Sequence, residues 1–146
     1  MTRVDFYLLS DAADGKQRFA CRLADKAYRL GHHSYILTAG ADEAATLDEL
    51  LWTFTASSFV PHAVYRPDAE VVDQAVLIGH APPPTAWRQV LVSLTPEVPD
   101  FFSRFNRVAE IVGAADAEKA AARERFRFYR ERGYVIETHN IQCSTP

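Results

Sequence analysis

The sequence predicts an α/β fold in which helices cover a mainly parallel sheet. Short apolar segments typical of buried strands alternate along the chain with longer segments whose apolar residues have helical spacing. Continuous apolar strands of this kind are typical of a sheet that is covered on both faces. The chain has 146 residues, of which 48% are hydrophobic and 24% charged, and this size and composition favour one globular domain.

The first half of the chain contains two expected strand–helix pairs. Val4–Leu9 is apolar and β-prone, and Gly15–Leu30 has helical spacing that ends at Gly31, where a left-handed residue can terminate a helix. The residues expected to face the core from this helix are Phe19, Leu23, Ala27 and Leu30. Tyr35–Thr38 is the second expected strand, and Asp42–Phe54 is the second expected helix, with acidic residues near its start.

The second half is expected to complete the sheet. Ser57–Pro67 breaks the periodicity, and a proline-rich loop at Pro82–Pro84 separates two apolar strands. The expected elements are strands at Ala75–Gly79 and Val90–Leu94, a short helix from Pro99 through Phe102 and Phe105, a strand at Val108–Val112, a helix at Asp116–Arg132 capped by Asp116 and ended by Gly133, and a strand at Tyr134–His139. Together they predict a single Rossmann-like domain over residues 1–141, with a short tail at 142–146.

Composition excludes several classes of protein. The net charge is −3, whereas a dedicated nucleic-acid binder is usually basic. No apolar run approaches the ~20 residues that cross a bilayer, and the first residues do not have the pattern of a signal peptide. Cys21 and Cys143 are too few for a disulfide framework. We therefore expect a cytoplasmic protein with reduced thiols.

Catalytic and cofactor motifs are missing from the positions where this fold would carry them. The segment after the first strand, Ser10–Gly15, matches neither GxGxxG nor GxxxxGK[ST], and its two aspartates would repel a phosphate. The five histidines do not have a metal-ligand spacing, and no serine or cysteine is linked to a base by a known motif. The sequence therefore predicts no catalytic residue, no metal site and no cofactor.

The last expected helix is unusually basic. Six of the sixteen Lys and Arg residues lie within its seventeen positions. At about 100° per residue, four of these cations fall within an arc of roughly 80°, with Phe126 beside them: Lys119, Arg123, Arg127 and Arg130. Arg125, Phe128 and Arg132 point away from this stripe. The pattern suits a peptide with acidic side chains and an apolar anchor, but taken alone it favours an ordinary solvated helix face.

A second unusual segment is LLWTFTASSFVPH at residues 50–62. Trp52, Phe54, Phe59 and Pro61 gather at a helix end and in the loop after it. Exposed aromatic residues often form a protein interface, but such a loop can also fold back and complete the core. The sequence leaves both interpretations open.

The chain resembles the chi subunit family of bacterial DNA polymerase III. Four stretches carry the resemblance in the family's order across nearly the whole chain: FYLL at Phe6–Leu9, LDELLW and SFVPH within Leu47–His62, PDFFSRFNRVAEIV at Pro99–Val112, and AARERFRFYRERGY at Ala121–Tyr134. The resemblance implies a non-catalytic replication adaptor that needs no cofactor. It also implies two protein partners and only indirect contact with DNA.

The resemblance implies that one face binds the acidic C-terminal tail of the single-stranded DNA-binding protein, which ends in phenylalanine. By position, this site comprises Val112, Lys119, Arg123, Phe126, Arg127 and Arg130. Arg123 is then the candidate for the terminal carboxylate, because its planar guanidinium can hold both oxygens. Val112 and Phe126 would line the pocket for the apolar anchor.

The resemblance assigns a second face to the clamp-loader subunit psi, or in some bacteria to a helicase-like repair protein. By position, this face comprises Trp52, Phe59, Pro61 and His62. Two alternatives remain beside the adaptor. A nucleic-acid-binding module would use the basic stripe directly, and a nucleotide-dependent enzyme on the same fold would need a ligand pocket at the strand ends.

Overall fold

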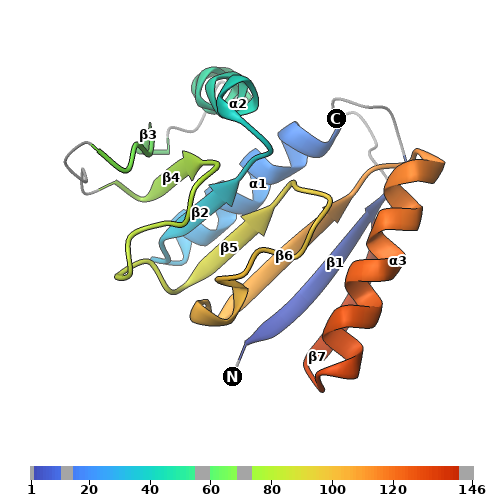
Figure 1. The fold of residues 1–146 in the computed structure, drawn as a ribbon. Helices are drawn as coiled ribbons and strands as arrows, with labels where there is room; N and C mark the ends of the chain where they lie inside the picture. The colour runs from blue at the N-terminus through green and yellow to red at the C-terminus, as the bar shows by residue number, and fades with distance from the viewer. Residues whose placement is uncertain (1, 11–14, 55–59, 69–73, 142–146) are drawn as a thin grey trace.

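The computed structural model describes residues 2–10, 15–54, 60–68 and 74–141, which form an α/β fold with helices on both faces of a sheet (Figure 1). Along the chain the elements are β1 (Arg3–Leu9), α1 (Gly15–Arg29), β2 (Ser34–Leu37), α2 (Ala41–Thr53), β3 (His62–Val64), β4 (Val76–Gly79), β5 (Val90–Ser93), the 3₁₀ helix η1 (Phe102–Arg104), β6 (Arg107–Val112), α3 (Asp116–Glu131) and β7 (Val135–Ile141). The predicted fold class is confirmed.

The seven described strands form one sheet in the order β3-β4-β2-β5-β6-β1-β7, and every described pairing is parallel. Sequence periodicity did not reveal β3, because a strand of three residues is too short to show alternation. β1 lies between β6 and β7, with Tyr7 opposite Ile111 on one side and His139 on the other. The first strand of the chain is therefore next to the two strands that flank α3.

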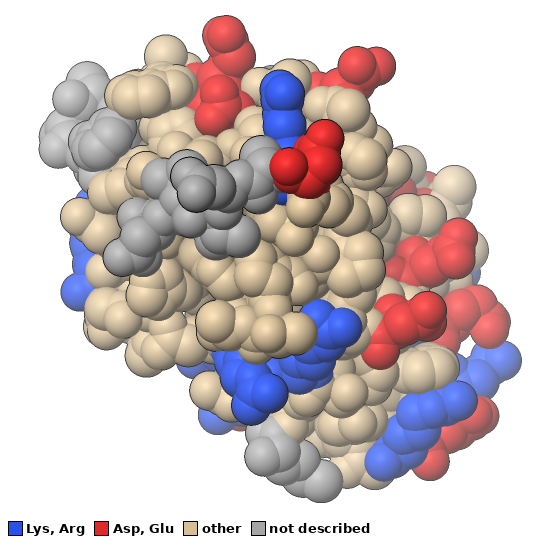
Figure 2. All heavy atoms as spheres, turned by 60° about the vertical axis from the view of Figure 1, so that its left-hand side comes forward, with Lys and Arg blue, Asp and Glu red and all other residues tan. Residues whose placement is uncertain are grey.

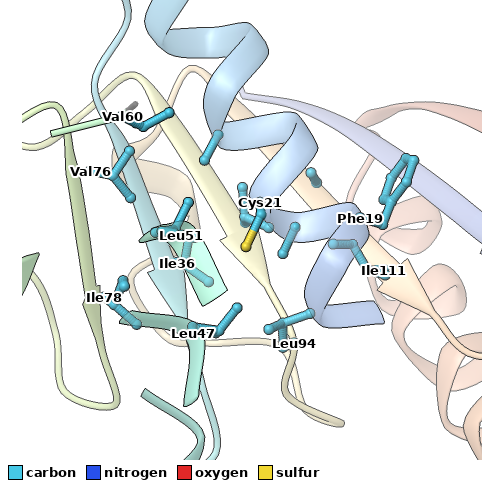
Figure 3. Packing of buried hydrophobic residues seen from close by; sticks show 14 of the residues in the cluster. Phe19, Cys21, Ile36, Leu47, Leu51, Val60, Val76, Ile78, Leu94 and Ile111 are labelled. Atoms are coloured by element: carbon cyan, nitrogen blue, oxygen red, sulfur yellow. The ribbon is translucent and has the colours of Figure 1, made fainter. Parts of the chain in front are cut away.

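Two hydrophobic clusters pack on opposite faces of the sheet. α1 and α2 cover one face with buried residues that include Ala20, Cys21, Leu47 and Leu51. Figure 3 shows buried side chains of this cluster packed between the helices and the strands. α3 covers the other face together with η1, and Figure 1 shows α3 in front of the sheet with α1 behind it. Because side chains alternate along a strand, β6 serves both clusters: Val108 and Val112 belong to the α3 cluster, and Ala109 and Ile111 to the α1 cluster.

The helix ends confirm two predictions and correct two others. Gly31 and Gly133 have φ angles of 81° and 79°, the left-handed conformation that glycine adopts easily after a helix. Leu30 is 63% exposed and does not face the core as predicted, because α1 ends one residue earlier, at Arg29. Asp116 is the first helical residue of α3, and Ala115 holds the cap position without a side-chain hydrogen bond.

Residues 142–146, predicted to form a tail, lie outside the described residues. None of the described helices combines the length and the hydrophobicity that a membrane-spanning helix requires.

Cys21 provides a test of the α1 core. Its side chain is fully buried, and burial raises the pKa of the thiol to about 12. Since the thiolate is the reactive species, on the order of 1 in 10⁴ of these thiols would be ionised at pH 8. We expect a Cys143→Ser variant to resist an aromatic disulfide reagent at pH 8 and to react completely in denaturant. Rapid reaction of the folded variant would contradict this packing.

Candidate peptide-binding site

α3 is fixed to the sheet by a buried polar network. Glu110 on β6 has no exposed surface, and it accepts hydrogen bonds from Arg125 Nε at 2.9 Å and from the Tyr129 hydroxyl at 2.7 Å. Arg125 also donates to the Pro96 carbonyl oxygen at 3.0 Å. Arg125 therefore points away from the basic stripe, as predicted, but the sequence did not indicate that it would be buried.

The network's charges depend on one another. Burial raises the pKa of the Glu110 carboxyl, and the neighbouring Arg125 guanidinium and the Tyr129 hydroxyl act in the opposite direction. Burial, followed by the charge of Glu110, raises the pKa of Tyr129, so its hydroxyl keeps the proton that it donates. A buried carboxylate with two such donors is stable only while both donors remain in place.

A cavity of about 240 Å³ opens beside this network, between α3 and the carboxyl-terminal ends of β1 and β6. Four of the six residues predicted for the tail site line it, namely Val112, Lys119, Arg123 and Phe126. The floor comes from β1, where Phe6 lies under the Phe126 ring with centroids 5.5 Å apart. The cavity therefore combines an apolar interior with two cationic side chains.

The other two predicted residues lie outside the cavity on the exposed side of α3. The Arg130 guanidinium carbon is 5.9 Å from the centre of the Phe126 ring, within the range of a cation–π contact. Arg127 is exposed and pairs with Glu124 through Nη1 and Oε1 at 3.4 Å. The structure thus places Arg130 against a cavity residue and Arg127 further round the helix.

Sequence reasoning missed the other residues that line the cavity, which are Phe6, Leu8, Leu9, Gly113, Ala122 and Thr138. They come from β1, from the connection after β6, from α3 and from β7. Phe6 and Leu8 are two residues apart, and the alternation of side chains along a strand predicts that they share one face of β1. The sequence did not indicate that β1 lies between β6 and β7, because hydrophobic periodicity predicts where strands occur but not which strands are neighbours in the sheet.

Trp52, in the last turn of α2, is 59% exposed, and its ring contacts the His62 ring edge to face at a centroid distance of 5.0 Å. The side chain of His62 has no exposed surface. Its Nδ1 is 2.6 Å from the Val60 carbonyl oxygen, and its Nε2 is 3.0 Å from the Asp48 carbonyl oxygen. His62 therefore supports Trp52 from inside.

Pro61 is partly buried, and Phe59 lies outside the described residues. Figure 2 brings forward the side of the molecule that carries β3, β4 and α2. In this view a group of Lys and Arg side chains lies just below the middle, Asp and Glu lie toward the top and along the right-hand side, and uncharged residues cover much of the remaining surface.

Among the described residues, Asp5, Glu137 and His139 form the one group with three potential metal ligands. Arg107 Nε donates to Asp5 Oδ2 at 3.0 Å, and an oxygen of Glu137 lies 2.6 Å from Arg3 Nη2. His139 Nε2 is 3.0 Å from the other Asp5 oxygen. Because two guanidinium groups already compensate the two carboxylates, this group favours an ion-pair network over a bound cation. It borders a second cavity, of about 330 Å³.

Residues 1–137 match the family model described as DNA polymerase III chi subunit, HolC. The chain is 42% identical over 142 residues to the DNA polymerase III subunit chi of Pseudomonas aeruginosa, covering 97% of this chain and 98% of that protein. It is 31% identical over 151 residues to the Escherichia coli subunit of the same name, covering 94% and 97%. A crystal structure of T4 UvsW shares the fold at a TM-score of 0.71 and 5% identity, over 97% of this chain and 42% of that one.

The network under α3 is testable through two arginines on the same helix. Arg125→Met fills a similar volume but leaves the buried Glu110 without its cation, which should lower the free energy of unfolding by about 3–5 kcal/mol. Arg127→Met removes an exposed ion pair and should change the free energy of unfolding by less than about 1 kcal/mol. Urea denaturation measures both. Equal effects of the two substitutions would show that Glu110 does not depend on Arg125.

Proposed function

The chain belongs to the DNA polymerase III chi subunit family, a family of non-catalytic replication accessory subunits, and from this premise we propose that it is an adaptor with two protein-binding faces. One face binds the acidic C-terminal tail of the single-stranded DNA-binding protein. The other binds the clamp-loader subunit psi, or a helicase-like repair protein where that is the partner. The adaptor acts in the cytoplasm and contacts DNA only through its partners.

The observation that carries the first half of the proposal is the cavity beside α3. Its interior is lined mainly by apolar side chains, and Lys119 and Arg123 are the two cationic residues in its lining. A phenylalanine at the end of a peptide presents an apolar ring and a carboxylate on the same residue. This chemistry matches the cavity, with the ring placed against Phe6 and Phe126 and the carboxylate held by the Arg123 guanidinium.

The exposed arginines of α3 extend the positive charge beyond the cavity. Arg127 and Arg130 lie near the cavity in an arc of the helix that solvent reaches, where they attract the acidic residues that precede the anchor. The Arg127–Glu124 pair is exposed on both sides and therefore weak, so the arginine is able to exchange this partner for a peptide carboxylate. Salt should screen these outer contacts more than those inside the cavity.

Charge also favours a peptide over DNA as the direct ligand. The chain carries a net charge of −3, so its overall field repels a polyanion, and the basic stripe is a local exception. A short peptide covers only that stripe and the cavity. A duplex or a long single strand would also approach the acidic parts of the surface.

The second half of the proposal rests on Trp52 and its surroundings. An exposed tryptophan held from below by a buried histidine is a fixed apolar anchor, and tryptophan is enriched among the residues that dominate binding energy at interfaces. Uncharged residues cover much of this side of the molecule, which suits a partner surface with few charges (Figure 2). We assign Trp52, Phe59 and Pro61 to this face, together with His62, which supports the tryptophan ring.

Arg123 tests the tail-binding face. Arg123→Ala should weaken the binding of an acidic peptide with a C-terminal phenylalanine by about 1.5–3 kcal/mol, because a charge-assisted hydrogen bond is lost. Arg132→Ala removes the same charge from the end of α3, where the guanidinium lies over the Phe128 ring, and should leave affinity nearly unchanged. Calorimetry measures the affinity of both variants for the peptide. If Arg123→Ala bound it as tightly as Arg132→Ala, Arg123 would not belong to the site.

Trp52 tests the second face. Trp52→Ala should abolish capture of psi in a pull-down and leave the affinity for the tail peptide within about twofold, since the two faces share no residue. Tyr28→Ala is the matched control, because Tyr28 is another exposed aromatic residue, 40% exposed, on α1. Circular dichroism checks folding. Loss of both functions together with loss of structure would show that Trp52 supports the fold and would contradict its assignment to the interface.

A further inference from the structure

Two glutamates hold corresponding positions in two different helices. Glu43 is the third residue of α2, and Glu118 is the third residue of α3. Each accepts a hydrogen bond from a backbone N–H in the connection before its helix: Ala39 N to Glu43 Oε1 at 3.1 Å, and Gly113 N to Glu118 Oε1 at 3.3 Å. Carboxylates in the first turn of a helix are stabilised by its macrodipole.

Both glutamates also contact the first turn of α1. Gln17 Nε2 donates to Glu43 Oε2 at 3.0 Å, and Lys16 Nζ donates to Glu118 Oε1 at 2.8 Å. The amino-terminal turns of the three described α-helices are therefore tied together at the carboxyl-terminal edge of the sheet. In open parallel sheets this edge, with its helix amino termini, is where anionic ligands bind. Here the chain's own carboxylates fill two of these positions.

Only the α3 contact borders the proposed tail site. Gly113 and Lys119 line the 240 Å³ cavity, whereas Glu118 lines a neighbouring cavity of about 260 Å³ with Lys16 and Arg125. Glu118 thus lies behind the wall that Gly113 and Lys119 form. A Cβ atom at position 113 would overlap the Glu118 carboxylate, so a larger residue there would have to displace the end of this side chain from the Gly113 backbone.

We propose that Glu118 is a positioning residue for the tail-binding cavity. Its carboxylate holds the Gly113 backbone against the first turn of α3 and, through Lys16, fixes that turn relative to α1. Lys119 follows Glu118 directly, so the position of its side chain at the cavity depends on the same contact. This inference rests on the proposed function and adds to it a residue that does not itself contact the peptide.

The test compares the two corresponding glutamates. Glu118→Ala should weaken binding of the acidic peptide ending in phenylalanine about fivefold, because the cavity wall loses its support. Glu43→Ala breaks the equivalent contact on α2, away from the cavity, and should change the affinity by less than about twofold. Thermal unfolding of both variants measures how much stability each contact contributes. A shared loss of stability cannot explain a loss of affinity in only one variant.

A double-mutant cycle separates positioning from general destabilisation. Gly113→Ala forces the new methyl group against the Glu118 carboxylate and should weaken peptide binding at least about fivefold. In the Glu118→Ala background the same substitution meets no carboxylate, so the double variant should bind no more weakly than Glu118→Ala alone.

Equal affinities for Glu118→Ala and the unmodified chain would overturn the inference and leave the proposed function standing. Additive losses in the cycle would also overturn it. Absence of peptide binding by the unmodified chain would refute the proposed function, and the role of Glu118 with it.

Discussion

The buried contact between Glu110, Arg125 and Tyr129 sets the position of α3, and the candidate site depends on that position. At about 100° per residue, Arg125 and Tyr129 lie on the face of α3 that meets the sheet, Phe126 and Lys119 on the next face round, and Arg127 beyond them on the solvent side. Once Glu110 holds the first face, the second must face the ends of β1 and β6. One ion pair thus determines which side chains line the cavity.

The same architecture explains how an α/β fold of the kind that often binds nucleotides can serve as an accessory subunit. Parallel sheets place helix amino termini at their carboxyl-terminal edge, where a phosphate usually binds. In this chain Glu43 and Glu118 occupy such positions and take their donors from the backbone and from α1. The open cavity lies to one side, on the α3 face. Under the proposed function, the fold therefore offers a peptide side chain and its carboxylate a mainly apolar cavity at this edge, between α3 and the ends of β1 and β6.

Sequence reasoning predicted the features that local physics determines. The order of the strands and helices other than β3 follows from periodicity and backbone preference, as do the glycines that end α1 and α3 and the arc of cations on α3. It did not predict what long-range pairing determines. The burial of Arg125 depends on Glu110, fifteen residues earlier on a strand, and the floor of the cavity depends on β1 lying between β6 and β7. The burial of His62 depends on carbonyl groups of Val60 and Asp48 that no local pattern places beside it.

The measurement that most directly tests the account is binding of the unmodified chain to a synthetic acidic peptide that ends in phenylalanine. The peptide would be compared with a free and with an amidated C-terminus, each at low and at high salt. The account predicts that amidation abolishes most of the affinity, because the carboxylate beside Arg123 is lost, and that salt weakens binding of the free peptide. Equal binding of the two peptides, or no binding at low salt, would contradict it and leave the basic stripe as a solvated face of α3.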